Sequence, residues 1–86
     1  MPLERQPAIR PAVFDYPSGH RTGRHVHDEH QVVYASDGVL SVETSGARWV
    51  LPAQRLAWVP AGIEHDVVAE SDASMAALYV LSLIHI

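Results

Sequence analysis

Cysteine is absent from the sequence, which excludes disulfide scaffolding and thiolate metal sites and fits a reducing compartment. Lysine and arginine form no cluster, and the formal net charge is -4, which argues against a chain that grips a phosphate backbone by itself. The N-terminus lacks the apolar core of a signal peptide, and the apolar residues 76–86 are too few to span a bilayer. We therefore expect a cytoplasmic protein with no membrane contact.

A sustained helical period is also missing, because no window repeats apolar residues every 3.6 positions between helix caps. Neither a Ser-His-Asp arrangement nor a glycine-rich phosphate loop occurs, so we expect no catalytic residue and no enzyme. The 86 residues allow one domain at most, and the hydrophobic fraction of 48% argues against a disordered tail.

Short strand signals recur along the chain, with turn residues between them. The predicted strands are 12–16, 31–36, 39–44, 47–51, 55–59, 65–70 and 75–80. Residues 1–11 contain three prolines and are interpreted as an arm, and residues 73–78 fit a short helix about as well as a strand. Seven or so short strands joined by tight turns predict an all-β sandwich or barrel.

The stretch from Gly19 to Gly38 holds four of the six histidines. Side chains alternate along extended backbone, so His25, His27 and Gln31 are expected to project to the same side. Three such donors can converge on an ion or a polar ligand, and His65 is the candidate for a fourth. Gln31 could instead be an edge residue that caps a strand.

Two motifs resemble those of the cupin superfamily. The first is Gly19, five residues, His25-x-His27, three residues, Gln31, six residues and Gly38; the second is Pro60-x-Gly62-x-x-His65. The resemblance implies a small RmlC-like jelly-roll barrel in which His25, His27, Gln31 and His65 hold one divalent metal (zinc, nickel, manganese or iron). The same four side chains could instead be a polar lining that binds an organic effector.

The sequence departs from the cupin pattern at three positions. Gln31 stands where the pattern usually has Glu, so the cluster loses a negative charge and offers a weaker ligand to a hard dication. Gln54 replaces the usual glycine at the start of the second motif, and Ala69 replaces the usual asparagine at its end.

A narrower resemblance runs from His25 through Trp49 and Trp58 to Gly62. These segments are similar to the N-terminal cupin of AraC-type bacterial transcriptional regulators. The resemblance implies a domain that senses a small-molecule effector, forms a homodimer in the full-length protein, and leaves DNA binding to a C-terminal helix-turn-helix half that this chain lacks.

We accordingly predict three regions. Residues 1–18 form an arm and first strand, and 19–80 form a cupin barrel that is incomplete at its C-terminus. Residues 81–86 form a non-native tail, since Leu-Ser-Leu-Ile-His-Ile matches a translated sequencing-library adaptor. Two alternatives stay open: a free-standing metal-binding cupin enzyme of the dioxygenase or isomerase type, and a barrel used for dimerisation alone.

Several other side chains receive structural interpretations. We expect His20 and His30 at the surface, Asp28 and Glu29 in a solvated loop, and Arg55 paired with Glu64 or Asp66. Trp49, Trp58 and Tyr34 could line a pocket, but large aromatic residues in a small β domain are more often core, and we favour the core for all three.

Overall fold

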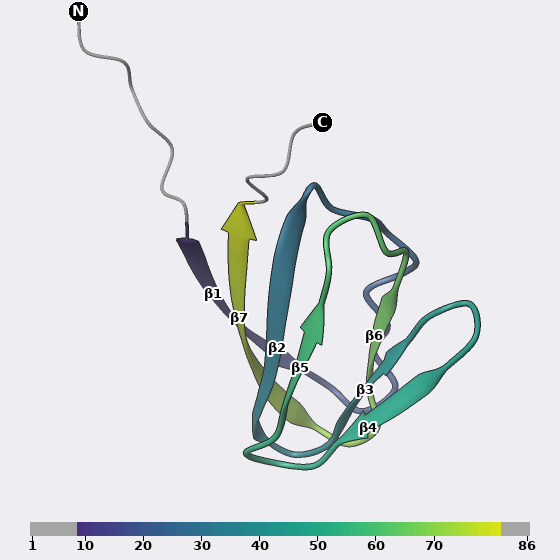
Figure 1. The fold of residues 1–86 in the computed structure, drawn as a ribbon. Coiled ribbons are helices and arrows are strands. Elements are labelled where there is room, and N and C mark those ends of the chain that lie inside the picture. The colour runs from purple at the N-terminus through teal and green to yellow at the C-terminus, as the bar shows by residue number, and fades with distance from the viewer. Residues whose placement is uncertain (1–8, 82–86) are drawn as a thin grey trace, which may run out of the picture.

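The computed structural model describes residues 9–81, which form two antiparallel sheets (Figure 1). The strands are β1 (Ile9–Tyr16), β2 (Glu29–Asp37), β3 (Leu40–Glu43), β4 (Arg48–Leu51), β5 (Leu56–Val59), β6 (Asp66–Ala69) and β7 (Ala73–Leu81). The sheets have the strand orders β1-β7-β2-β5 and β4-β3-β6. Over residues 9–81 no helix has the length and apolarity to cross a membrane. The prediction of an all-β barrel is confirmed.

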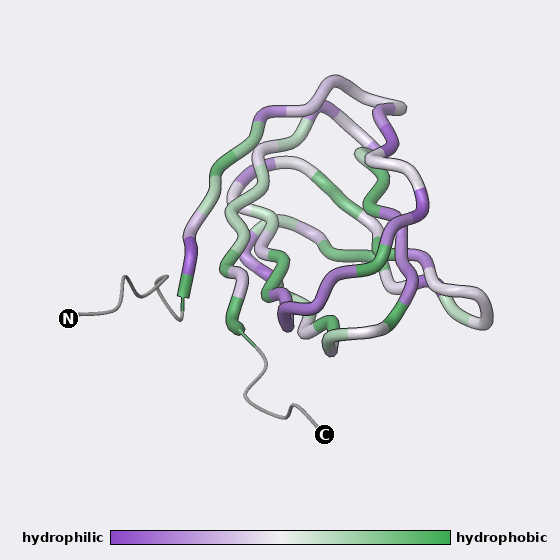
Figure 2. Tube along the Cα trace, turned by 90° about the horizontal axis from the view of Figure 1, so that it is seen from above, coloured by the Kyte–Doolittle hydropathy of each residue, from purple (hydrophilic) through white to green (hydrophobic). Residues whose placement is uncertain are grey.

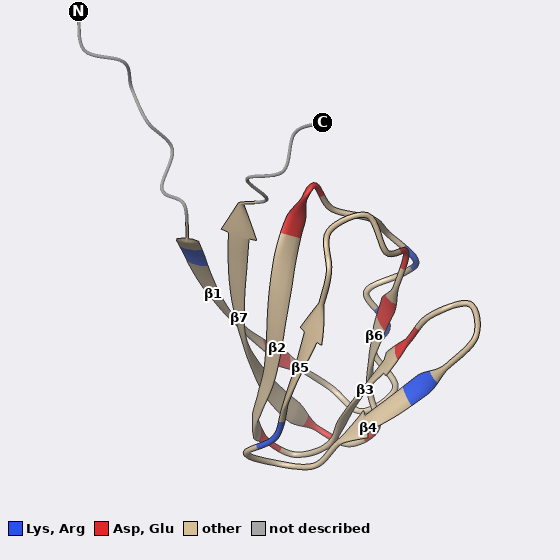
Figure 3. Cartoon of the chain, viewed as in Figure 1, with Lys and Arg blue, Asp and Glu red and all other residues tan. Residues whose placement is uncertain are grey.

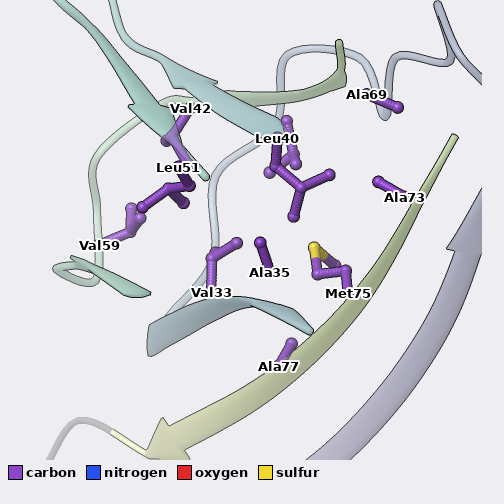
Figure 4. Packing of buried hydrophobic residues seen from close by; sticks show 11 residues of the cluster. Val33, Ala35, Leu40, Val42, Leu51, Val59, Ala69, Ala73, Met75 and Ala77 are labelled. Atoms are coloured by element: carbon purple, nitrogen blue, oxygen red, sulfur yellow. The ribbon is translucent and has the colours of Figure 1, made fainter. Parts of the chain in front are cut away.

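The two sheets enclose one apolar core. Seen from above, the trace curls into a ring around it (Figure 2). Alternate residues of β2 point inward, and Val33 and Ala35 are fully buried there. Leu40 and Val42 of β3 and Met75 of β7 meet them from the other strands (Figure 4). Each large apolar side chain buried in this way contributes about 1.5–3 kcal/mol.

The ends of the described chain correct two expectations. β1 begins at Ile9 rather than at residue 12 and includes Pro11, so the predicted arm was too long. Proline is tolerated there because β1 is an edge strand. Residues 73–78 lie within β7, which favours the strand interpretation. The rest of the arm and residues 82–86 of the predicted tail lie outside the described residues.

The assignment of the tryptophans to the core was wrong. The side chains of Trp49 and Trp58 are 51% and 52% exposed. β4 and β5 are edge strands, and Trp58 faces away from the core opposite Val32 of β2. Tyr34 lies on the same outer face and is half-buried. In a sheet that is covered on one face only, Trp58 stays at the surface because its strand parity points outward. Trp49 lies opposite the buried Val42, and it is exposed although its parity is inward, at the edge strand β4.

Two polar assignments also need correction. His30 is half-buried rather than at the surface, because its ring stacks on Trp58 and its Nδ1 accepts a hydrogen bond from Ala61 N at 2.9 Å. Arg55 does not make the expected ion pair: Glu64 pairs with Arg24 at 3.3 Å, and Asp66 pairs with Arg21 at 3.1 Å.

Charged residues occur on both sheets (Figure 3), and those of β3, β4 and the segments beside them form a chain of ion pairs. Glu43 of β3 contacts Arg21 at 3.0 Å and Arg48 at 3.6 Å, and Arg48 continues to Glu70 at 2.7 Å. These pairs are largely exposed, so each contributes little to stability.

The turn between β4 and β5 shows why the cupin pattern usually has glycine at the position of Gln54. Arg55 N donates to Pro52 O at 3.1 Å, and Gln54 takes a φ of +70°. That geometry is a type II turn, whose third residue is usually glycine because L-side chains crowd the backbone at positive φ. Gln54 therefore occupies a position that favours glycine for conformational reasons alone.

Gly38 lies in the tight turn between β2 and β3. Its φ is +74°, and a Cβ there would collide with the backbone carbonyl oxygen of Asp72 and crowd Ala73 Cα at 2.8 Å. We expect Gly38→Ala to lower the free energy of unfolding by about 2–3 kcal/mol, measured by urea denaturation. Gly46→Ala is the matched control, since Gly46 has no atom within 4 Å of an added Cβ. Equal stability of the two variants would contradict this account.

Candidate functional site

A backbone pair joins the two histidine-bearing segments. His25 N donates to His65 O at 3.0 Å, and His65 N donates to His25 O at 2.9 Å. His25 precedes β2 and His65 precedes β6, so both lie in connecting segments rather than in the strands. This isolated antiparallel bridge brings together residues that are 40 positions apart in the sequence.

The three imidazoles converge as their spacing predicted. The ring centroids are 4.3 Å apart for His25 and His65, 4.6 Å for His25 and His27, and 5.5 Å for His27 and His65. One ring nitrogen from each lies within 4.8 Å of those of the other two. His65 is buried, whereas His25 and His27 are half-buried. The cluster is therefore set into the barrel rather than displayed on its surface.

Gln31 completes the cluster from β2. It is 2% exposed, and its side-chain Oε1 lies 3.0 Å from Nε2 of His65. The alternative of an edge residue that caps a strand was wrong, because β2 lies between β7 and β5 and Gln31 faces the interior. All four predicted side chains thus meet at one place.

The backbone carbonyls around the cluster determine where the imidazole protons sit. Nδ1 of His25 lies 2.6 Å from Gly23 O, and Nδ1 of His65 lies 2.9 Å from Ile63 O. A carbonyl oxygen can only accept, so both Nδ1 atoms donate, and in the neutral rings both Nε2 atoms carry lone pairs. Nε2 of His65 then needs a donor, and the Gln31 carboxamide supplies one when its NH₂ group faces the ring.

His27 carries the one unsatisfied polar side-chain atom detected in the interior of the described chain. Its Nε2 is buried and has no hydrogen-bond partner. Burial lowers the pKa of His27 below its ordinary value, and the neighbouring rings of His25 and His65 lower it further. Burial likewise lowers the pKa of His65, against a smaller opposing effect of its hydrogen bond to Ile63 O. Both rings therefore favour the neutral form, in which imidazole can accept a proton or bind a metal.

Sequence reasoning missed two neighbours of the cluster. Tyr79 of β7 packs edge-on against His27 with ring centroids 5.4 Å apart, and Arg10 lies over the Tyr79 ring at 4.5 Å. Arg10 also pairs with Glu29 at 2.7 Å, so Glu29 is not in a solvated loop as expected. The parity of β7 could have marked Tyr79 as inward-facing, but its position opposite Gln31 depends on the pairing of β2 with β7.

Asp66 anchors the segment that carries His25. Its Oδ1 accepts hydrogen bonds from Gly23 N at 3.0 Å and from the Thr22 hydroxyl at 3.3 Å, and its Oδ2 accepts from Arg21 at 3.1 Å. The carbonyl of Gly23 in turn holds Nδ1 of His25. Because Asp66 follows His65 directly, one short segment of chain positions both sides of the cluster.

The donor set fits a divalent metal that prefers nitrogen ligands. His25 and His65 would each offer a lone pair on Nε2, and the buried Nε2 of His27 lacks any other partner. Zinc–nitrogen bonds of about 2.0–2.1 Å separate two ligand nitrogens by about 3.4 Å, so the rings would need to close in slightly. A metal would also have to displace the Gln31 contact from His65, and Gln31 supplies no charge in return.

Residues 11–83 match the family described as the AraC-like ligand binding domain. A curated relative is the HTH-type transcriptional regulator NimR of Escherichia coli K12, which is 29% identical over 56 residues. That match takes in 65% of this chain and 20% of the relative, so the chain spans about a fifth of the length of the relative.

Solved structures share the fold at low sequence identity. A conserved protein of unknown function from Streptococcus pyogenes superimposes with a TM-score of 0.84 at 21% identity, over 95% of this chain and 72% of that one. A cupin superfamily protein from Desulfitobacterium hafniense gives 0.84 at 13% identity, over 95% and 75%. KdgF from Halomonas sp. gives 0.80 at 22% identity, over 93% and 74%. The predicted cupin barrel is thereby confirmed.

The lowered pKa values of His27 and His65 predict a pH dependence of stability. Their folded-state pKa values lie below the unfolded value of about 6.5, so the unfolded chain binds more protons as the pH falls. In the presence of a chelator, the free energy of unfolding should be constant above about pH 7 and decline as the pH falls below about 6.5. Urea denaturation at pH 7.5, 6.5 and 5.5 measures this.

The matched variant for the pH series is His27→Asn, which removes one of the two titrating rings and should flatten the decline. A chain that gains stability between pH 7.5 and 5.5 would show that the buried rings prefer the protonated form.

The side chain at position 31 should determine how tightly the cluster binds a metal. Gln31→Glu adds a carboxylate to three imidazoles, and we expect it to raise zinc affinity over that of the unmodified chain by about tenfold or more, measured by calorimetry on protein without a histidine tag. Gln54→Glu adds the same charge at an exposed turn and should leave zinc affinity unchanged. Equal zinc affinity of the two variants would place the metal elsewhere.

Proposed function

We propose, because this chain belongs to the family of AraC-like ligand binding domains, that it is the effector-sensing cupin domain of a bacterial transcriptional regulator. Its effector would be a small molecule bound by His25, His27, Gln31 and His65. The observation that carries this assignment is the polar cluster itself: four side chains converge inside an apolar barrel, and the buried Nε2 of His27 has no partner.

The cluster is suited to recognition because its members are held in place before a ligand arrives. Backbone carbonyls orient the rings of His25 and His65, and the bridge between these two residues holds their segments together. A site that is already ordered loses little conformational entropy when a ligand binds. A bound metal would add a Lewis acid at the three imidazoles to which an oxygen of the effector could bind.

Sensing requires that the effector distinguish two arrangements of the protein. An effector that binds one arrangement more tightly shifts the population towards it, by no more than the difference in binding free energy. In the whole regulator we propose that this shift reaches a separate DNA-binding part and that the protein acts as a homodimer. Both proposals come from the family and from NimR, of which the matched segment covers 20%.

The family match favours sensing over catalysis. A metal-dependent cupin enzyme would use the three histidines to hold its metal, and the neutral Gln31 makes that site weaker than one with a carboxylate. The hydrogen bond between Gln31 and His65 also competes for one of the three ligand nitrogens.

The test is a transcriptional reporter driven by the full-length regulator and exposed to a panel of small molecules. For any compound that alters transcription, His65→Ala and His27→Ala should weaken the response at least about tenfold, because each removes a group from the proposed site. His20→Ala is the control, since His20 is exposed and stacks on Tyr16 outside the cluster.

Soluble expression and circular dichroism of each variant separate sensing from folding. If His65→Ala abolishes soluble expression while His27→Ala responds like the unmodified regulator, the histidines have a structural role and the proposed site is wrong.

A further inference from the structure

A cleft of about 620 Å³ opens between the two sheets, beside β4 and β5. Its lining residues are Val42, Thr44, Trp49, Val50, Leu51, Leu56, Ala57, Trp58, Val59, Pro60 and Ile63. β4 and β5 are the edge strands of their respective sheets, so no strand in the described chain pairs across this gap. The volume is typical of small-molecule sites, which run from about 300 to 1,000 Å³.

The cleft is apolar from its rim to its floor. Trp49 and Trp58 stand at the rim with about half of each side chain exposed. The floor consists of Val42, Leu51 and Val59, which are buried and lie close together in the core (Figure 4). Flat indole faces favour aromatic or alicyclic partners, so the cleft selects for a compact apolar molecule.

The inner wall of the cleft leads to the polar cluster through two contacts. Val59 lines the cleft and is the cross-strand partner of Gln31. Directly opposed side chains in an antiparallel pair lie about 4.5–5.5 Å apart. Ile63 also lines the cleft, and its carbonyl accepts the hydrogen bond from Nδ1 of His65. Val59 and Ile63 therefore separate the cleft from Gln31 and His65, which do not themselves line it.

The inner end presents hydrogen-bond acceptors. His25 directs Nδ1–H to a backbone carbonyl, so its ring offers a lone pair on Nε2, whereas the Nε2 lone pair of His65 is occupied by Gln31. Once the NH₂ group of Gln31 faces His65, the carboxamide oxygen is the atom it offers to a ligand. A carboxylate on the ligand would meet these lone pairs unfavourably, whereas a hydroxyl or amine can donate to them.

We propose that the cleft and the imidazole cluster form a single binding site for a compact aromatic or alicyclic molecule that carries a hydroxyl or amine. The apolar body lies against Trp49, and the donor group passes Val59 and Ile63 to reach Gln31 and the imidazoles. This inference rests on the proposed function, since it names the chemical class of the effector.

Two probes with the same ring system test the class: 2-naphthol, which donates, and 2-naphthoate, which carries a carboxylate. Binding to the 86-residue chain is followed by NMR in the presence of a chelator. The sequence contains two tryptophans; the indole N–H signal of Trp49 reports on the cleft, and that of Trp58, which stacks on His30, reports on the outer face of β5. The ring signals of His25, His27 and His65 report on the cluster. We expect 2-naphthol to shift both the Trp49 signal and the cluster signals and to bind at least about tenfold more tightly than 2-naphthoate, a difference of about 1.4 kcal/mol.

A pair of variants locates the apolar body. Trp49→Ala should weaken 2-naphthol about tenfold, because it removes one wall of the cleft at an exposed position where folding does not depend on it. Val13→Ala is the control, since Val13 is 76% exposed on β1 and does not line the cleft.

Each other outcome overturns the inference in a recognisable way. Shifts confined to the histidines would leave the proposed effector site standing and remove the cleft from it. Shifts confined to Trp49 would show that the cleft and the cluster are separate sites. Equal or tighter binding of 2-naphthoate, or no shift with either probe, would refute the chemical class. The reporter assay separates site and function. If 2-naphthol shifts both sets of signals in the 86-residue chain, but the full-length regulator with His65→Ala still responds normally to its effector, the sensing function is refuted and the binding site is not.

Discussion

The antiparallel backbone pair between His25 and His65 is the constraint on which the rest of the site depends. Two hydrogen bonds join segments that lead into strands of different sheets and bring three imidazoles together. Asp66 reinforces the pair from the next position, because its carboxylate holds the backbone of Gly23, and Gly23 holds the ring of His25. Loss of this pairing would separate the imidazoles of His25 and His65.

The hydrogen bond between Gln31 and His65 gives the cluster its chemical character. A carboxylate at position 31 would bring a charge that favours a dication, whereas the carboxamide brings none and occupies a lone pair of His65. The same amide leaves an oxygen acceptor beside Val59, where the apolar cleft meets the cluster. Gln31, in place of the usual Glu of the motif, therefore makes the cluster a weaker site for a dication.

The family and the geometry support the function in different ways. The match over residues 11–83 identifies a ligand-binding domain, and the solved cupins confirm only the barrel. The ligand class comes from this chain alone: two exposed tryptophans, a floor of buried aliphatic residues and neutral imidazoles. The family match supports a ligand-binding role, and the local side chains support the ligand class that we propose.

The sequence by itself determined the strands, the turns and the identity of the four polar residues, because these depend on local properties. Alternation placed Gln31 on the inward face of β2, and Asp37-Gly38 predicted a turn that needs positive φ. Tertiary structure alone decided the rest. Tyr79 meets His27 only because β7 pairs with β2, and Trp49 borders a cleft only because β4 and β5 end their sheets. Strand order and register are non-local, so no pattern of neighbouring residues contains them.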